Sequence, residues 1–143
     1  MTRAFVCTAR QVHWTLVLIL TTAAILRLFG ALDRNHWLPD RAAQLSGDEP
    51  AYANIARELL NGEGYTWPGR VPLYPATLAV LFWVTGESYM WVRILQSIIS
   101  VLAVYLTYRL GEMLFGCRGA CIAAGLAAIT PPLIRQPEQI MSE

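Results

Sequence analysis

The sequence predicts an all-α membrane protein with several bilayer-spanning helices and one short amphipathic helix at the membrane surface. Of its 143 residues, 55% are hydrophobic and 15% are charged, and the mean hydropathy is +0.41. The apolar residues fall in long blocks with the charged residues between them, which is the pattern that a bilayer imposes on a sequence. The net charge of +1 leaves no excess of positive charge to follow a nucleic-acid backbone. We therefore expect a single membrane domain over residues 1–143 and no nucleic-acid partner.

Residues 14–32 predict the first span. As a helix this stretch reaches roughly 28 Å, against a hydrocarbon core of about 30 Å. Arg27 alone interrupts it, and an arginine near a helix end is expected to extend its charged group to the membrane interface. Because Arg3 and Arg10 precede the apolar run, a cleaved signal peptide ending near Phe29 is the alternative interpretation.

The section from residue 33 to residue 70 holds most of the acidic side chains and is expected in water or at the interface. Within it, residues 49–60 predict a short amphipathic helix, with Pro50 in its first turn and Gly62 just beyond its end. Such a helix is about 18 Å long, too short to cross a bilayer, so we expect it to lie flat on the membrane surface. Its predicted apolar stripe consists of Tyr52, Ile55, Ala56, Leu59 and Leu60.

Three further apolar stretches follow. Residues 71–86 carry no charge but contain Pro72 and Pro75, so this stretch is expected to be re-entrant or interfacial. Residues 90–110 predict a second full span. Residues 120–134 predict a third, short span that is rich in Ala and Gly and therefore suited to close helix packing.

The arginines in the short loops predict the orientation. Arg3 and Arg10 precede the first span, and Arg109 and Arg118 flank the loop after the second, and such positive charges favour the cytoplasm. Both sets can be cytoplasmic only if residues 71–86 do not cross. We therefore expect a multi-pass protein of the cell (inner or plasma) membrane, with a cytoplasmic N-terminus and the first long loop outside.

Asp48 and Glu49 form an acidic pair at the start of the predicted surface helix. A carboxylate held at the lipid boundary is a candidate for chemistry, because such placement is costly. The alternative is that Asp48 caps the helix and Glu49 complements its dipole. Tyr52 lies four residues after Asp48, so the two are expected to share the helix face turned toward the spans, where a pocket could form.

The cysteines predict neither a disulfide framework nor a metal site. Cys7, Cys117 and Cys121 are odd in number, and neither His13 nor His36 is close to them in sequence.

Several short motifs occur together in a fixed order. They are Arg27-Leu28, Gly-Asp-Glu-Pro-Ala-Tyr at 47–52, Ala56, Gly-Glu-Gly-Tyr at 62–65, Arg-Val-Pro-Leu-Tyr-Pro at 70–75 and Leu-Phe-Gly at 114–116. In this succession the chain resembles the N-terminal part of the polyprenyl-phosphate-sugar-dependent glycosyltransferases of the GT-C fold. This superfamily includes protein O-mannosyltransferases, aminoarabinose transferases of lipid A and bacterial proteins of the dolichyl-phosphate-mannose mannosyltransferase type. The resemblance runs from about residue 16 to residue 143 and depends on the succession of motifs, not on any one of them.

The resemblance implies a polyprenyl-phosphate sugar as donor substrate and an extracytoplasmic lipid, glycan or protein as acceptor. Asp48 would be the catalytic base on the acceptor hydroxyl, with Glu49 beside it. Arg70 is the candidate cation for the departing phosphate, and the alternative for Arg70 is a solvated or interfacial arginine. Tyr52 and Glu143 complete the predicted substrate-binding residues. No cofactor is assigned, and a divalent metal is left open because adjacent helical residues diverge by about 100° and make a poor pair of ligands.

The chain departs from that family in length. Those enzymes have many more spans, and three spans can scarcely enclose a lipid carrier and an acceptor. We therefore expect a fragment with little or no transferase activity on its own. The alternative function is a small non-enzymatic membrane subunit or assembly partner, in which Asp48 and Glu49 only cap a helix.

Overall fold

The computed structural model describes residues 9–37, 48–65 and 71–138. These residues form helices and turns and contain no strand, as the sequence predicts. The helices are α1 (Ala9–Trp37), α2 (Glu49–Leu60), α3 (Leu73–Thr85), α4 (Tyr89–Ile129) and α5 (Pro131–Arg135), followed by the short 3-10 helix η1 (Gln136–Glu138).

Two helices are long and apolar enough to cross a membrane, namely α1 over Val12–Asp33 and α4 over Tyr89–Ile129. Many of their large apolar side chains point outward, including Phe29 at 71% exposure and Met113 at 81%. A water-soluble protein rarely presents so continuous an apolar surface, because exposing it to water is unfavourable. The fold therefore indicates association with a membrane.

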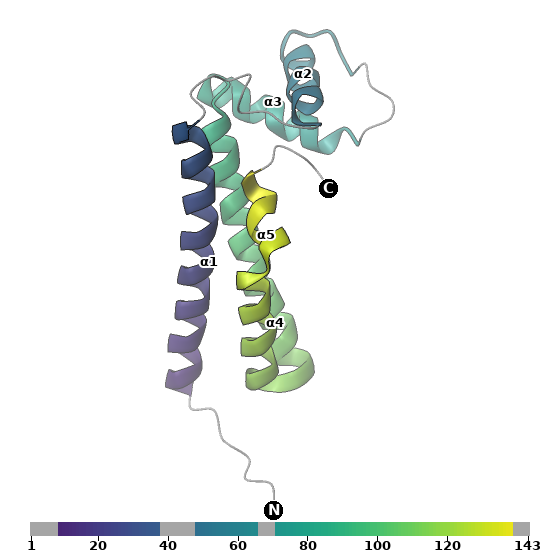
Figure 1. Ribbon diagram of the computed structural model, residues 1–143. Helices are drawn as coiled ribbons and strands as arrows, with labels where there is room; N and C mark the ends of the chain where they lie inside the picture. Colours follow the sequence, from purple (N-terminus) through teal and green to yellow (C-terminus); the bar gives the residue numbers. More distant parts are fainter. Residues whose placement is uncertain (1–8, 38–47, 66–70, 139–143) are drawn as a thin grey trace, which may run out of the picture.

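The chain reverses direction within α4. Gly116 has φ 72° and ψ −178°, a conformation that favours glycine, and it separates a first arm (89–115) from a second arm (117–129). Figure 1 shows the two arms running side by side in opposite directions beside α1. They pack closely, since a Cβ built on Gly111 would lie 2.9 Å from Ala120 Cα. The arms correspond to the segments that the sequence predicts at 90–110 and 120–134.

The second arm ends earlier than the sequence predicts. Thr130 has φ −65° and ψ 118°, an extended conformation, and α5 starts again at Pro131. A residue before proline is disfavoured in the α region, which explains the break at Thr130. The predicted segment 120–134 is therefore two helical pieces.

At one end of the long helices, α3 projects sideways from the start of α4 and packs against α2 (Figure 1). Its 13 residues reach about 20 Å, which is shorter than the hydrocarbon core. Gly86 ends α3 with φ 69° and donates its N–H to Phe82 O at 2.9 Å, as in common helix C-caps.

Two apolar clusters hold these elements together. One joins α2, α3 and the start of α4 through Tyr52, Ala53, Ala56, Leu78, Ala79, Phe82, Tyr89 and Val92. The other joins α1 to both arms of α4 through Ala23, Val104, Tyr108, Ala120, Ala124 and Ala128. The small residues of the second cluster let the helix backbones approach closely.

Candidate functional site

The start of α2 presents Asp48 at the surface. Asp48 occupies the N-cap position, and its backbone carbonyl accepts hydrogen bonds from the N–H groups of Ala51 (3.1 Å) and Tyr52 (3.4 Å). Its side chain is exposed and makes no capping hydrogen bond. Pro50 lies in the first turn, where its missing N–H costs nothing. The local structure therefore places the carboxylate at the surface instead of using it as a side-chain cap.

Glu49, by contrast, is completely buried. The expectation that Asp48 would share the inward face with Tyr52 is wrong. Glu49, Tyr52, Ala53 and Ala56 follow the i, i+3, i+4, i+7 spacing of one helix face, and all four are buried. Asp48 lies one residue outside this stripe, so its side chain points elsewhere. The spacing alone could have identified Glu49 as the inward residue.

An aromatic pair, Tyr52 and Tyr74, links α2 to α3. The rings of Tyr52 and Tyr74 meet edge to face, with centroids 5.4 Å apart and an interplanar angle of 89°. The Tyr74 hydroxyl also accepts a hydrogen bond of 2.9 Å from Gln96 Nε2 on α4. Burial raises the pKa of Tyr74, the bond from Gln96 opposes this rise, and the nearby Glu49 carboxylate adds to it. The phenol is therefore protonated at physiological pH.

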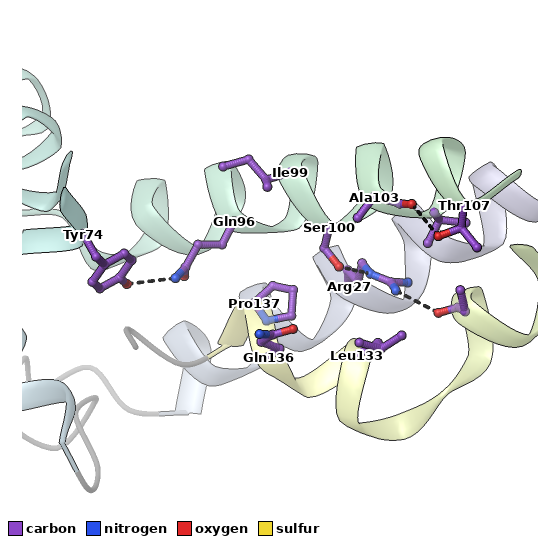
Figure 2. Close-up of a pocket in the computed structure, with 12 residues that line it drawn as sticks. Arg27, Tyr74, Gln96, Ile99, Ser100, Ala103, Thr107, Leu133, Gln136 and Pro137 are labelled. Atoms are coloured by element: carbon purple, nitrogen blue, oxygen red, sulfur yellow. Dashed lines mark hydrogen bonds between the residues drawn. The ribbon is translucent and has the colours of Figure 1, made fainter. Parts of the chain in front are cut away.

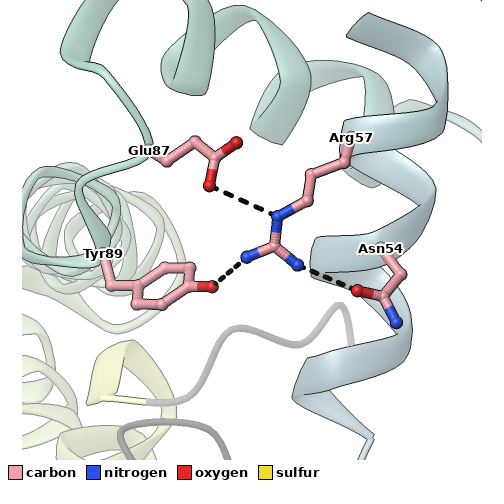
Figure 3. Close-up of polar contacts among 4 residues, drawn as sticks. All are labelled: Asn54, Arg57, Glu87 and Tyr89. Carbon is pink, nitrogen blue, oxygen red and sulfur yellow. Dashed lines mark hydrogen bonds and ion pairs between the residues drawn. The ribbon is translucent and has the colours of Figure 1, made fainter. Parts of the chain in front are cut away.

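Arg57 holds the other end of α2 against the α3–α4 turn (Figure 3). Its Nε lies 3.3 Å from Glu87 Oε2, its Nη2 donates to the Tyr89 hydroxyl at 2.7 Å, and its Nη1 donates to Asn54 Oδ1 at 2.8 Å. No local pattern in the sequence predicts the contacts from α2 to the turn, because Glu87 and Tyr89 lie 30 and 32 positions after Arg57. These contacts fix the orientation of α2, and therefore of Asp48, relative to the long helices.

Arg27, which the sequence predicts at the membrane interface, lies in the interior, and so does Arg93 on α4. Arg27 and Arg93 are both 0% exposed. Arg27 donates from Nε to Ser100 Oγ at 2.7 Å and from its two Nη atoms to backbone carbonyls at 3.2 Å. The expectation that Arg27 extends to the interface is therefore wrong, because hydrogen-bond acceptors inside the helix packing satisfy it where it stands.

Two neighbouring hollows run along the first arm of α4 and share Tyr74, Gln96 and Ile99. One has a volume of about 360 Å³ and lies between Arg27, Ser100 and η1, as Figure 2 shows. The other, of about 410 Å³, lies between α3 and α4 and is lined mainly by Val, Leu and Ile side chains. We call the two together the α3–α4 groove. Both volumes fall in the range of sites for small ligands.

One polar atom in this groove is unsatisfied. Gln96 Oε1 is buried and has no hydrogen-bond partner among the described residues. Buried polar atoms are nearly always paired in folded proteins. The unpaired acceptor lies at the junction of the two hollows, since Gln96 lines both of them.

Two of the predicted site residues, Arg70 and Glu143, lie outside the described residues. Of the other three, the structure brings Glu49 and Tyr52 together on the inner face of α2 and leaves Asp48 at its exposed start. Within the described ranges, no group of three or more His, Cys, Asp or Glu residues could hold a metal ion.

Comparisons of the chain with protein-family models, with curated proteins and with solved structures give no match.

Proposed function

We propose that this chain belongs to a membrane glycosyltransferase that moves a sugar from a polyprenyl-phosphate carrier to an acceptor outside the cytoplasm. The observation that carries the proposal is the juxtaposition at α2. An exposed carboxylate, Asp48, starts a helix whose inner face packs, through Tyr52 and Tyr74, on the α3–α4 groove. A lipid-linked sugar needs both features, a place for an apolar chain and a base where water and an acceptor can reach it.

In the proposed arrangement the chain crosses the bilayer three times, with α1, with the first arm of α4, and with the second arm of α4 continued by α5. The α4 turn at Gly116 then faces the cytoplasm beside Arg109 and Arg118, which agrees with the preference of positive charge for that side. The α2 and α3 helices lie at the outer interface. Asp48 is thereby outside the cell, where lipid-linked sugars are accessible to extracytoplasmic acceptors.

The proposed reaction is a direct displacement. Asp48 takes the proton of the acceptor hydroxyl, the acceptor oxygen bonds to the anomeric carbon, and the bond from that carbon to the phosphate oxygen breaks. Polyprenyl phosphate leaves with the bonding electrons, and the sugar inverts its configuration. Arg70 is the proposed cation for the phosphate charge. The burial of Glu49 favours a positioning role, in which Glu49 holds the start of α2 and does not contact the acceptor.

A transfer assay tests the proposal. Membranes that contain the protein expressed from its complete gene are incubated with radiolabelled polyprenyl-phosphate sugars, and incorporation into acceptor material is measured. Asp48→Asn should lower transfer at least about 100-fold, because general-base catalysis contributes on the order of 10² to 10⁴. Glu63→Gln is the matched control, since it removes an exposed carboxylate just beyond α2 and should leave transfer unchanged. Full activity of Asp48→Asn would remove the base assignment.

The second candidate is a non-enzymatic membrane subunit, and the burial of the charged residues favours it. Glu49, Arg27 and Arg93 all lie inside the helix packing, where each can serve the fold alone. If no transfer with any polyprenyl-phosphate sugar is detected from the complete gene product, this candidate replaces the first.

A further inference from the structure

Arg27 makes an unusual set of contacts for a buried cation. It is 0% exposed, yet within the described residues no carboxylate lies within ion-pair distance of it. A buried charge without compensation is strongly unfavourable, so its neutral partners must supply that compensation. These partners are Ser100 Oγ and the carbonyl oxygens of Ala23, Ala127 and Ala128.

Two of these carbonyls, those of Ala127 and Ala128, belong to the second arm of α4 and lack their usual hydrogen-bond donors. In an α-helix, the carbonyls of Ala127 and Ala128 would accept from the N–H groups of residues 131 and 132. Both of those residues are proline, which has no N–H. The helix break at Thr130 therefore leaves two adjacent carbonyls without their usual donors. The contact at Ala128 is buried, and the contact at Ala127 is partly buried beside the 360 Å³ hollow.

Arg27 supplies both donors. Its Nη2 donates to Ala127 O and its Nη1 to Ala128 O, each at 3.2 Å (Figure 2 draws one of these bonds). A guanidinium group presents its N–H groups in a planar fork, so one side chain can reach two neighbouring acceptors. The carbonyls at this helix end also carry the negative end of the helix dipole, equivalent to about half an elementary charge, which offsets the buried cation.

We propose that Arg27 is the positioning residue of the α4–α5 break, where its guanidinium group replaces the two backbone donors that Pro131 and Pro132 lack. The consequence reaches the groove, because Leu133, Gln136 and Pro137 beyond the break form one wall of the 360 Å³ hollow. Arg27 thus lines this hollow itself and also holds in place the segment after the break, which forms the hollow's wall. This inference does not depend on the proposed transferase activity.

A double-mutant cycle tests the proposal in the purified full chain in detergent, with thermal unfolding measured by circular dichroism. Arg27→Met removes the donors and the charge while keeping an unbranched apolar stem. If Arg27 were only a buried charge, this change would be neutral or stabilising. Because it orphans two carbonyls, we expect it to lower the Tm by about 5 °C or more.

The second arm of the cycle restores the backbone donors. In the Pro131→Ala/Pro132→Ala background, the helix can satisfy its own carbonyls, so Arg27→Met should lower the Tm by less than half as much. Arg93→Met is the matched control, because Arg93 is a second fully buried arginine and the donor to both carbonyls is Arg27. Its effect should be equal in the two backgrounds. An equal effect of Arg27→Met in the two backgrounds would overturn the proposal.

Two further measurements keep the test decisive if Arg27→Met does not fold. Arg27→Lys keeps the charge but loses the planar fork, so it should lower the Tm in the wild-type background and less in the double-alanine background. Amide hydrogen exchange over residues 130–137 should accelerate in Arg27→Lys and return toward the wild-type rate when both prolines are replaced. A wild-type Tm and wild-type exchange in Arg27→Lys would show that charge alone suffices and would contradict the proposal.

Discussion

At the scale of single residues, three charged side chains, Arg27, Glu49 and Arg93, are completely buried. An arginine near the end of an apolar segment ordinarily extends its charged group to the membrane interface. Arg27 nevertheless lies inside, because its guanidinium group donates to the carbonyls of Ala127 and Ala128. Pro131 and Pro132 leave these carbonyls without their usual backbone donors. No pattern within α1 carries that information. Glu49 is different, since its spacing to Tyr52 and Ala53 already marks the inward face of α2.

Glu87 offers a test of strain at a single residue. It adopts φ 61°, a left-handed conformation that costs a residue with a Cβ about 1–2 kcal/mol. Its ion pair with Arg57 is more than one-third exposed and contributes only about 0–1 kcal/mol. Glu87→Ala loses the pair and keeps the strain, whereas Glu87→Gly loses both. We expect the glycine variant to be the more stable of the two by about 1 kcal/mol in chemical unfolding. A more stable alanine variant would contradict the strain assignment.

At the scale of elements, the apolar blocks of the sequence predict the helices well. The range predicted for a helix, 49–60, is the range of α2, because Pro50 and Gly62 mark its two ends, whereas its place at the membrane surface stays a prediction. The segment at 71–86 appears as the 13-residue α3. The end of the segment predicted at 120–134 was wrong. Thr130 precedes Pro131 and is extended, so the helix stops at Ile129 and α5 begins after the break. The positions of Arg70 and Glu143 stay predictions.

The contact between the two arms of α4 gives a prediction about packing. A Cβ on Gly111 would meet the Ala120 backbone at 2.9 Å, whereas a Cβ on Gly125 meets nothing within 4 Å. Gly111→Ala should therefore destabilise the chain by about 1–3 kcal/mol through overpacking. Gly125→Ala should be neutral or stabilising by up to about 1 kcal/mol, because alanine is the better helix former. Unfolding of the two variants in detergent measures the difference, and equal stability of both would show that the arms do not pack as described.

At the scale of the whole molecule, the two ends of the helix bundle differ in character. One end carries α2, α3, the exposed Asp48 and the end of α1, and the opposite end carries the turn at Gly116 (Figure 1). The sequence could predict this polarity, because charge and apolar blocks alternate in a regular order. It could not predict the α3–α4 groove, which is formed by side chains from α1, α3, α4, α5 and η1. The proposed function requires that the two ends face opposite compartments.

Cysteine labelling measures this polarity directly. In a variant with Cys7, Cys117 and Cys121 replaced by alanine, a single cysteine is introduced at Asp48 or restored at position 117. Intact cells are then treated with a membrane-impermeant maleimide. We predict that position 48 reacts in intact cells and that position 117 reacts only after the membrane is permeabilised. Labelling of position 117 in intact cells, with position 48 protected until permeabilisation, would contradict an extracytoplasmic base at Asp48.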